Sequence, residues 1–254
     1  MWKGRIIKLA LFLSIAGALV LLVSGLGSRF GLWSFRTGFS MVQVGLWMTG
    51  LAAAVGIIGL VWALRSRPRQ NMSTALAAVV IAGVVSSIPL STVLSARSGQ
   101  YPPIHDITTD TQEPPQFDAV MPMRGEDSNS TDYVTKTGFF GPYKDKSYAE
   151  IQSQYYPDIM PVMMGITPDA AFENAVATAR DMGWEIVAAA PEEGRIEATA
   201  TTFWFGFKDD VIIRLRPEGT GTRVDIRSTS RVGLGDRGTN AKRIRAYVAR
   251  LTAR

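Results

Sequence analysis

The sequence has 254 residues, of which 46% are hydrophobic, and a formal net charge of +5, with no cysteine. The lack of cysteine excludes disulfides, thiol catalysis and thiolate metal sites. None of the 22 acidic residues precedes Asp106, whereas nine of the 27 basic residues do, so the positive charge belongs to the N-terminal region and does not indicate nucleic-acid binding.

Three apolar runs lie in this basic region, at residues 9–26, 41–64 and 74–94. They contain 18, 24 and 21 residues, and none of them contains a charged residue. A helix rises about 1.5 Å per residue, so each run is long enough to cross a hydrocarbon core of roughly 30 Å. The pattern predicts a transmembrane region of three helices over residues 1–97.

The first run has a second interpretation, because Lys3, Arg5 and Lys8 precede it as they would in a secretory signal peptide. The run is long, and no clear A-x-A cleavage site follows it. We therefore favour an uncleaved signal anchor. Both interpretations place the soluble part of the chain on the same side of the membrane.

The basic residues beside the runs predict the orientation. Three precede the first run, and the short loop between the second and third runs carries Arg65, Arg67 and Arg69. Cytoplasmic loops are enriched in such residues, so the N-terminus and this loop are expected in the cytoplasm. Residues from 98 onward are then extracytoplasmic, and periplasmic in a Gram-negative cell. The protein is predicted to span the bacterial inner membrane and to contact its lipids.

The predicted spans contain no ionisable side chain, which argues against an ion or proton pathway. Ala52 and Gly56, like Ala78 and Ala82, are small residues four positions apart, which allow helices to pack closely. Pro89 is expected to kink the third span. These features predict a compact membrane anchor.

The soluble part, residues 98–254, begins with an irregular stretch over 98–166, in which 146–155 is the one predicted short helix. From residue 167 the periodicity is strong. Thr167 and Pro168 are favourable at the N-cap and first position of a helix that ends near Gly183. The segment 167–252 is predicted to be compact.

Four strands and a last helix follow in this segment. The strands are expected at 184–190, 195–205, 210–216 and 222–230, and the helix at 239–251. The order α-β-β-β-β-α predicts a two-layer α+β domain, with both helices on one face of an antiparallel sheet.

Two long segments resemble a known family. They are YPPIHDITTDTQEPPQF at 101–117 and the region 194–244, which contains GRIEATATTFWFGFKDDVIIRLRP and GTRVDIRSTSRVGLGDRGTNAKRI. In this order they are similar to the uncharacterised bacterial family catalogued as domain of unknown function 1499. The resemblance covers about residues 100–252. It implies a membrane-attached or exported domain, and it implies no activity.

His105 is the only histidine and is followed by Asp106 and Asp110. A histidine with two carboxylates can ligate a metal or act as an acid–base pair, so these three are the catalytic candidates. The interpretation we favour is structural, with the segment bracing the sheet. No metal or other cofactor is predicted.

Two further patterns favour structural roles. Residues 233–238 match G-x-G-x-x-G, but only 16 residues follow, too few for the rest of a dinucleotide-binding unit. Asp236 is instead expected to cap the last helix. Asp209 and Asp210 are adjacent in a strand, so they point to opposite faces and favour turn or salt-bridge roles.

The sheet face away from the predicted helices is rich in arginine. Five side chains alternate with the buried positions and are the candidate ligand-binding residues: Arg214, Arg216, Arg223, Arg227 and Arg231. Such a face can bind an anionic partner. The alternatives are an ordinary solvated face of Arg–Asp pairs, or a basic face covered by the acidic segment that precedes it.

The sequence therefore favours a membrane-tethered extracytoplasmic binding or scaffold domain. Its expected partner is an envelope protein or another anionic envelope component, with no nucleic acid. The alternative is a metal- or acid–base-dependent enzyme that acts on an envelope glycan or lipid through the His105 segment.

Overall fold

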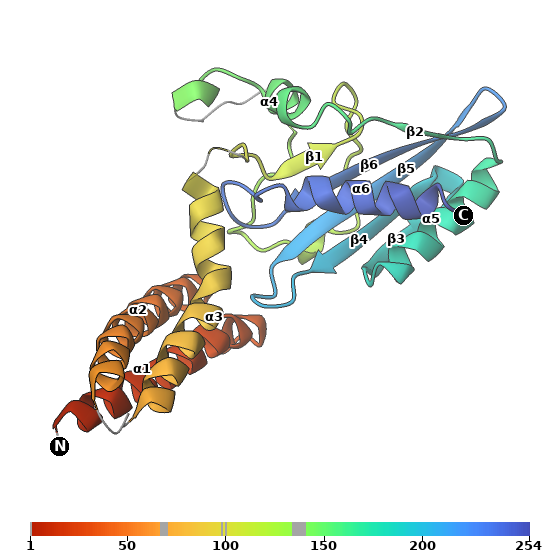
Figure 1. The fold of residues 1–254 in the computed structure, drawn as a ribbon. Coiled ribbons are helices and arrows are strands. Elements are labelled where there is room, and N and C mark those ends of the chain that lie inside the picture. The colour runs from red at the N-terminus through yellow and green to blue at the C-terminus, as the bar shows by residue number, and fades with distance from the viewer. Residues whose placement is uncertain (1, 67–70, 98, 100, 134–140) are drawn as a thin grey trace. The chain divides into compact units, whose positions relative to one another are not determined.

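A computed structural model describes residues 2–66, 71–97, 99, 101–133 and 141–254 (Figure 1). The chain forms two compact units. One contains residues 1–98 together with the short segment 203–206, and the other contains 99–202 and 207–254.

The first unit contains three long helices, α1 (Trp2–Arg29), α2 (Phe35–Arg65) and α3 (Met72–Arg97). Each is long and apolar enough to cross a membrane, as the sequence predicts. Ser34 caps α2, where its hydroxyl accepts a hydrogen bond from the Thr37 amide at 3.2 Å. The expected cytoplasmic residues Arg67 and Arg69 lie outside the described residues.

Small residues let these helices approach one another closely. Ala52, Gly56, Ala78 and Ala82 are all buried. A Cβ atom added at Gly45 would lie 2.6 Å from Cγ of Leu21, which is too close for any real side chain. Pro89 lies inside α3.

The second unit is built on a six-stranded antiparallel sheet in the order β1-β6-β5-β4-β3, with β2 also paired to β6. The strands are β1 (Asp106–Thr108), β2 (Val162–Met164), β3 (Glu185–Ala190), β4 (Arg195–Thr201), β5 (Lys208–Glu218) and β6 (Gly221–Ser230). Its α-helices are α4 (Tyr148–Tyr155), α5 (Pro168–Asp181) and α6 (Thr239–Leu251). Short 3-10 turns occur at Met121–Met123, Gly141–Tyr143 and Pro191–Glu193.

Helices α5 and α6 both cross one face of this sheet (Figure 1). Ala171, Ala175 and Ala179 of α5 and Ile244 and Leu251 of α6 are buried in one core with the apolar strand residues. Those strand residues alternate along β4, β5 and β6, and they are Ile196, Ala198, Ala200, Val211, Ile213, Leu215, Val224 and Ile226. The helix-on-sheet α+β arrangement predicted from the sequence is therefore confirmed.

Two features differ from the predicted elements. Strands β1 and β2 come from the stretch expected to be irregular, and they extend the predicted four-stranded meander by pairing with β6. Strand β4 ends at Thr201 instead of Phe205. It stops because the chain turns there, with Gly206 at φ 69°, a conformation that glycine adopts easily.

Replacement of Gly45 by valine is expected to destabilise the helical anchor by about 1–3 kcal/mol, because the new side chain overlaps Leu21. Gly50→Val in the same helix is the matched control, since nothing lies within 4 Å of a Cβ atom at Gly50. Both changes have the same effect on helix propensity. Thermal unfolding of the full chain in detergent, followed by circular dichroism, compares them. Equal melting temperatures would contradict the close packing described here.

Candidate functional site

The sheet face opposite α5 and α6 carries the arginines that the sequence singles out, and it is not an open surface. The chain between Thr109 and Thr131, called the covering segment below, contributes groups that contact this face. Glu197, Asp210, Asp225 and Arg227 are each fully buried beneath it. Buried charges are tolerated only where they are paired and hydrogen-bonded, so the contacts of each one explain its place.

Among the residues that the structure describes, Arg227 of β6 is the largest fully buried side chain. Its Nε and Nη2 atoms donate to the two carboxylate oxygens of Asp106 at 3.0 and 2.7 Å, and Nη1 donates to the Pro115 carbonyl at 2.9 Å. The guanidinium carbon also lies 5.1 and 5.5 Å from the ring centroids of Phe117 and Tyr133, within cation–π range. Arg227 thereby joins β6 to β1 and to the covering segment.

Asp210 of β5 is held in a similar way. It accepts hydrogen bonds from Arg231 at 2.8 to 3.2 Å and from the Thr199 hydroxyl at 3.0 Å, and it pairs with Arg124 of the covering segment. Arg231 also donates to the Met123 carbonyl at 2.7 Å. Asp209, the adjacent residue, faces the helices and pairs with Arg243. The two aspartates thus point to opposite faces in salt-bridge roles.

Glu197 of β4 binds the covering segment through backbone amides of that segment and not through one of its side chains. Its carboxylate accepts from the backbone amides of Asp118, Ala119 and Val120 at 3.0 to 3.2 Å. Arg195 of the same strand supplies the counter-charge. Three successive amides converging on one carboxylate form an anion-binding nest, here filled by the protein's own side chain.

Arg214, Arg216 and Arg223 form the partly exposed rim of this face, with side-chain exposures of 18%, 36% and 24%. Asp225 accepts from all three at 2.9 to 3.3 Å, and Asp110 contacts Arg214 and Arg223 at 3.1 and 2.8 Å. These three arginines are called the arginine rim below. The sequence pattern alone placed them in one row with Arg227 and Arg231, which the structure encloses.

Glu113 is the outermost carboxylate at the rim. Its Oε2 atom lies 2.6 Å from Nη1 of Arg216, yet 69% of its side chain is exposed. The hydrogen bond from Arg216 holds the pKa of Glu113 below its usual value. The rim therefore already binds one carboxylate that stands largely in solvent.

The side chain of His105 does not form one group with those of Asp106 and Asp110, the two aspartates proposed to act with it. Asp106 is engaged by Arg227 and Asp110 by the rim, whereas Nε2 of His105 lies 3.1 Å from the Tyr148 hydroxyl. Burial lowers the pKa of the His105 imidazole. Within the described part of the chain, no group of three or more His, Asp or Glu residues is placed to hold a metal ion.

The glycine-rich loop at 233–238 leads into α6, and Asp236 caps that helix. Its carboxylate accepts from the Gly238 and Asn240 amides at 2.8 and 2.7 Å. This is the expected structural role. Burial raises the pKa of Asp236, partly offset by these two hydrogen bonds.

A cavity of about 200 Å³ lies near the Asp110 end of the rim. Gln152 of α4 is part of its wall and is itself committed to β1, since it accepts from the Thr108 amide at 3.0 Å and donates to the Thr108 carbonyl. The remaining lining residues are Thr109, Asp110, Thr111, Gln112, Ser153, Tyr156, Pro157, Ile159, Met160 and Pro161.

Sequence reasoning missed Arg124, Glu197 and Gln152. Glu197 alternates with apolar residues of β4 as a solvent-facing residue would, so its burial leaves no local signal. Arg124 and Gln152 act through partners 86 and 44 residues away. Only the tertiary fold brings these groups together.

Comparison with known protein families matches the sheet-containing unit of the chain. The family described as "Protein of unknown function (DUF1499)" matches residues 106–251, from β1 to the end of α6. The chain belongs to this family. The match covers the whole network described above and leaves out the three apolar helices. A comparison with curated proteins finds no match.

One solved structure with some similarity is that of TTHA0849 from Thermus thermophilus. It is 13% identical over 37% of this chain and 94% of that chain, with a TM-score of 0.23. A similarity this low contributes nothing to the functional argument.

Arg227→Met is expected to destabilise this member of the family by about 3–5 kcal/mol, because it leaves the Asp106 carboxylate buried without its partner. Arg245→Met is the control, since Arg245 pairs with Asp158 at the surface and such pairs contribute at most about 1 kcal/mol. Denaturant unfolding of the full chain, followed by fluorescence, measures both. A similar loss in the two variants would mean that Arg227 is not the buried anchor.

Acid is expected to destabilise the fold through His105. Its pKa is lowered from 6.5 in the folded state, so the unfolded chain takes up this proton first. Stability is therefore complete above about pH 6.5 and falls as the pH drops from there toward the folded-state pKa. The loss of melting temperature between neutral and mildly acidic pH should be smaller in His105→Gln, which lacks the only imidazole. An identical pH profile in both proteins would exclude this role.

Proposed function

We propose that this protein is a membrane-tethered extracytoplasmic domain that binds an anionic group of the cell envelope at the arginine rim. The observation that carries the proposal is the partial exposure of Arg216 next to a carboxylate, Glu113, that is itself mostly in solvent. Arg227 and Arg231 of the same row are enclosed by the fold, so the rim is where this row of arginines can meet a partner.

The three apolar helices that precede the domain support a membrane tether. The basic residues before α1 and between α2 and α3 favour a cytoplasmic location for both segments. After an odd number of spans, the family domain then lies on the opposite side, which is the periplasm in a Gram-negative cell. The membrane concerned is proposed to be the inner membrane.

The rim joins two inner carboxylates to two outer, exposed ones. Three guanidinium groups face the buried carboxylates of Asp110 and Asp225, while the exposed Glu113 contacts Arg216 and the exposed Glu218 lies 4.0 Å from Nε of Arg223. Because Glu113 is exposed and held chiefly by Arg216, a ligand carboxylate or phosphate can replace it with little loss of protein packing. Arginine binds both groups through paired hydrogen bonds.

A single cysteine at Gln112 tests both parts of the proposal, because the natural chain has no cysteine. Gln112 is exposed and adjacent to Glu113. A membrane-impermeant, thiol-reactive photo-crosslinker is added to spheroplasts that contain the Gln112→Cys protein. Attachment of the reagent reports that the domain is extracytoplasmic, and illumination then captures what occupies the rim.

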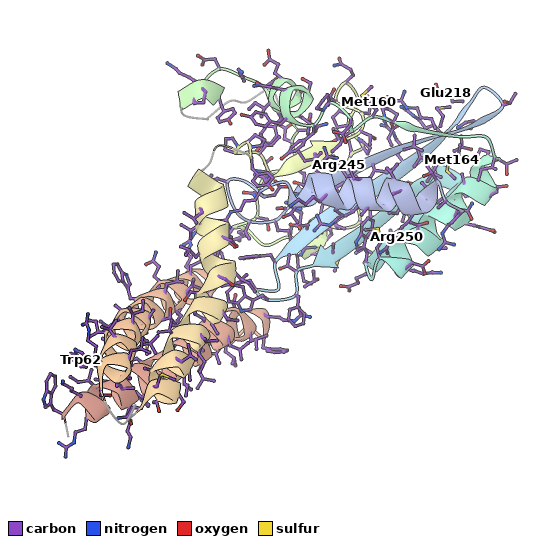
Figure 2. All side chains as sticks on the ribbon, in the orientation of Figure 1. Trp62, Met160, Met164, Glu218, Arg245 and Arg250 are labelled. Carbon is purple, nitrogen blue, oxygen red and sulfur yellow. The ribbon has the colours of Figure 1, made fainter. Side chains whose placement is uncertain are left out.

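The expected result is a discrete crosslinked species that disappears when Arg216→Glu is added. It should persist with Arg250→Glu, a matched charge reversal at an exposed position on α6 (Figure 2). Reagent attachment only after the membrane is permeabilised would overturn the proposed orientation. A species that is unchanged by Arg216→Glu would overturn the rim as the binding site.

A further inference from the structure

One end of the sheet carries two exposed apolar tips. The register places the end of β4, the start of β5, the end of β6 and the start of β1 in one row, since Thr201 pairs with Lys208, Asp209 with Ser230, and Asp106 with Thr229. The connections that leave this row are therefore neighbours. They are the β4–β5 turn at 202–207, the loop at 231–238, and the chain that arrives from the third apolar helix.

The β4–β5 turn is the more apolar of the two tips. Four of the five residues 203–207 are aromatic. The turn is closed by two hydrogen bonds of 2.8 Å, from the Thr202 amide to the Phe207 carbonyl and from the Phe207 amide to the Thr202 hydroxyl. At its end, 82% of Phe203 is exposed. Within this turn Phe205 is buried and Trp204 is half-buried, so Phe203 is the aromatic side chain that it presents to solvent.

The loop at 231–238 adds a second apolar side chain at the same end. Leu234 is 87% exposed, and the exposed basic residue Arg237 follows three positions later. Lys208, which is half-buried, flanks the first tip. A single exposed hydrophobic residue is ordinary on a protein surface. Aromatic and leucine side chains flanked by basic residues are instead the composition of segments that enter a lipid headgroup layer.

The tether supplies the reason for a lipid partner at this end. Only eight residues separate the end of α3 at Arg97 from the start of β1 at Asp106. Fully extended, such a linker reaches about 30 Å at roughly 3.3–3.6 Å per residue. Because β1 begins in the row that carries both tips, the short linker keeps these tips within reach of the bilayer surface.

We propose that this end of the sheet, through Phe203 and Leu234, enters the headgroup layer of the membrane that anchors the chain. Turn backbone is tolerated at that depth, because water still reaches its polar groups there. The interaction fixes which end of the domain faces the lipid. It does not depend on the arginine rim, since it follows from the tips and the tether alone.

The test uses three single-cysteine variants of the full chain, each labelled with the environment-sensitive fluorophore NBD. Phe203→Cys and Leu234→Cys place the label on the tips, and their exposure means that the changes remove little packing. Glu218→Cys places it in the β5–β6 hairpin, at the opposite end of an 11-residue strand (Figure 2). Each protein is reconstituted into vesicles of phosphatidylethanolamine and phosphatidylglycerol.

Labels at 203 and 234 should show blue-shifted emission, quenching by lipids that carry a nitroxide near the headgroup, and several-fold less quenching by aqueous iodide than the label at 218. Iodide quenching at 203 equal to that at 218 would overturn the proposal. So would protection of 203 from both quenchers, since this would mean that protein rather than lipid covers the tip.

Discussion

The ion pair between Arg227 and Asp106 is the contact on which the rest of the soluble domain depends. It joins residues 121 positions apart and fixes the first strand after the tether against the C-terminal part of β6. Two buried charges are costly to remove from water, and here the cost is offset by paired hydrogen bonds, a backbone carbonyl and two aromatic faces. Such a pair accepts few alternative arrangements, so it specifies the register of β1 more than it adds net stability.

The same principle extends along the covered face and gives the sheet two kinds of core. On the helix side, interchangeable apolar groups fill space, and their burial is non-directional. On the other side, Glu197 and Asp210 each require particular donors from residues 118–124. The covering segment has little regular secondary structure, and these directional contacts hold it in place. Its conformation is therefore set by the strands beneath it rather than by its own backbone preferences.

This division explains what could be predicted from the sequence. Alternation in β4, β5 and β6 and the capped helix from Thr167 identify the apolar layer, because burial on that side leaves a period of two or 3.6 residues. Strands β1 and β2 have three residues each, too few for a period to appear. On the polar side, alternating Arg and Asp residues give the same sequence pattern whether solvent or another segment of the chain covers them. The enclosure of Arg227 depends on Pro115 and Thr131, which no local pattern connects to β6.

The network also limits where the domain can meet other molecules. Its charged side chains contact one another inside the domain except at the rim. There Arg216 of β5 lies opposite Arg223 of β6 in the sheet, close to the β5–β6 turn. The aromatic turn lies beyond Lys208, at the other end of β5. Lys208 and Arg216 are eight positions apart along the strand, which is about 26 Å at roughly 3.3 Å per residue. If the aromatic end faces the lipid, as proposed, the rim is carried away from the bilayer, where it can bind an anionic group without competition from lipid headgroups. A rigid sheet with a short tether is suited to hold these two ends apart.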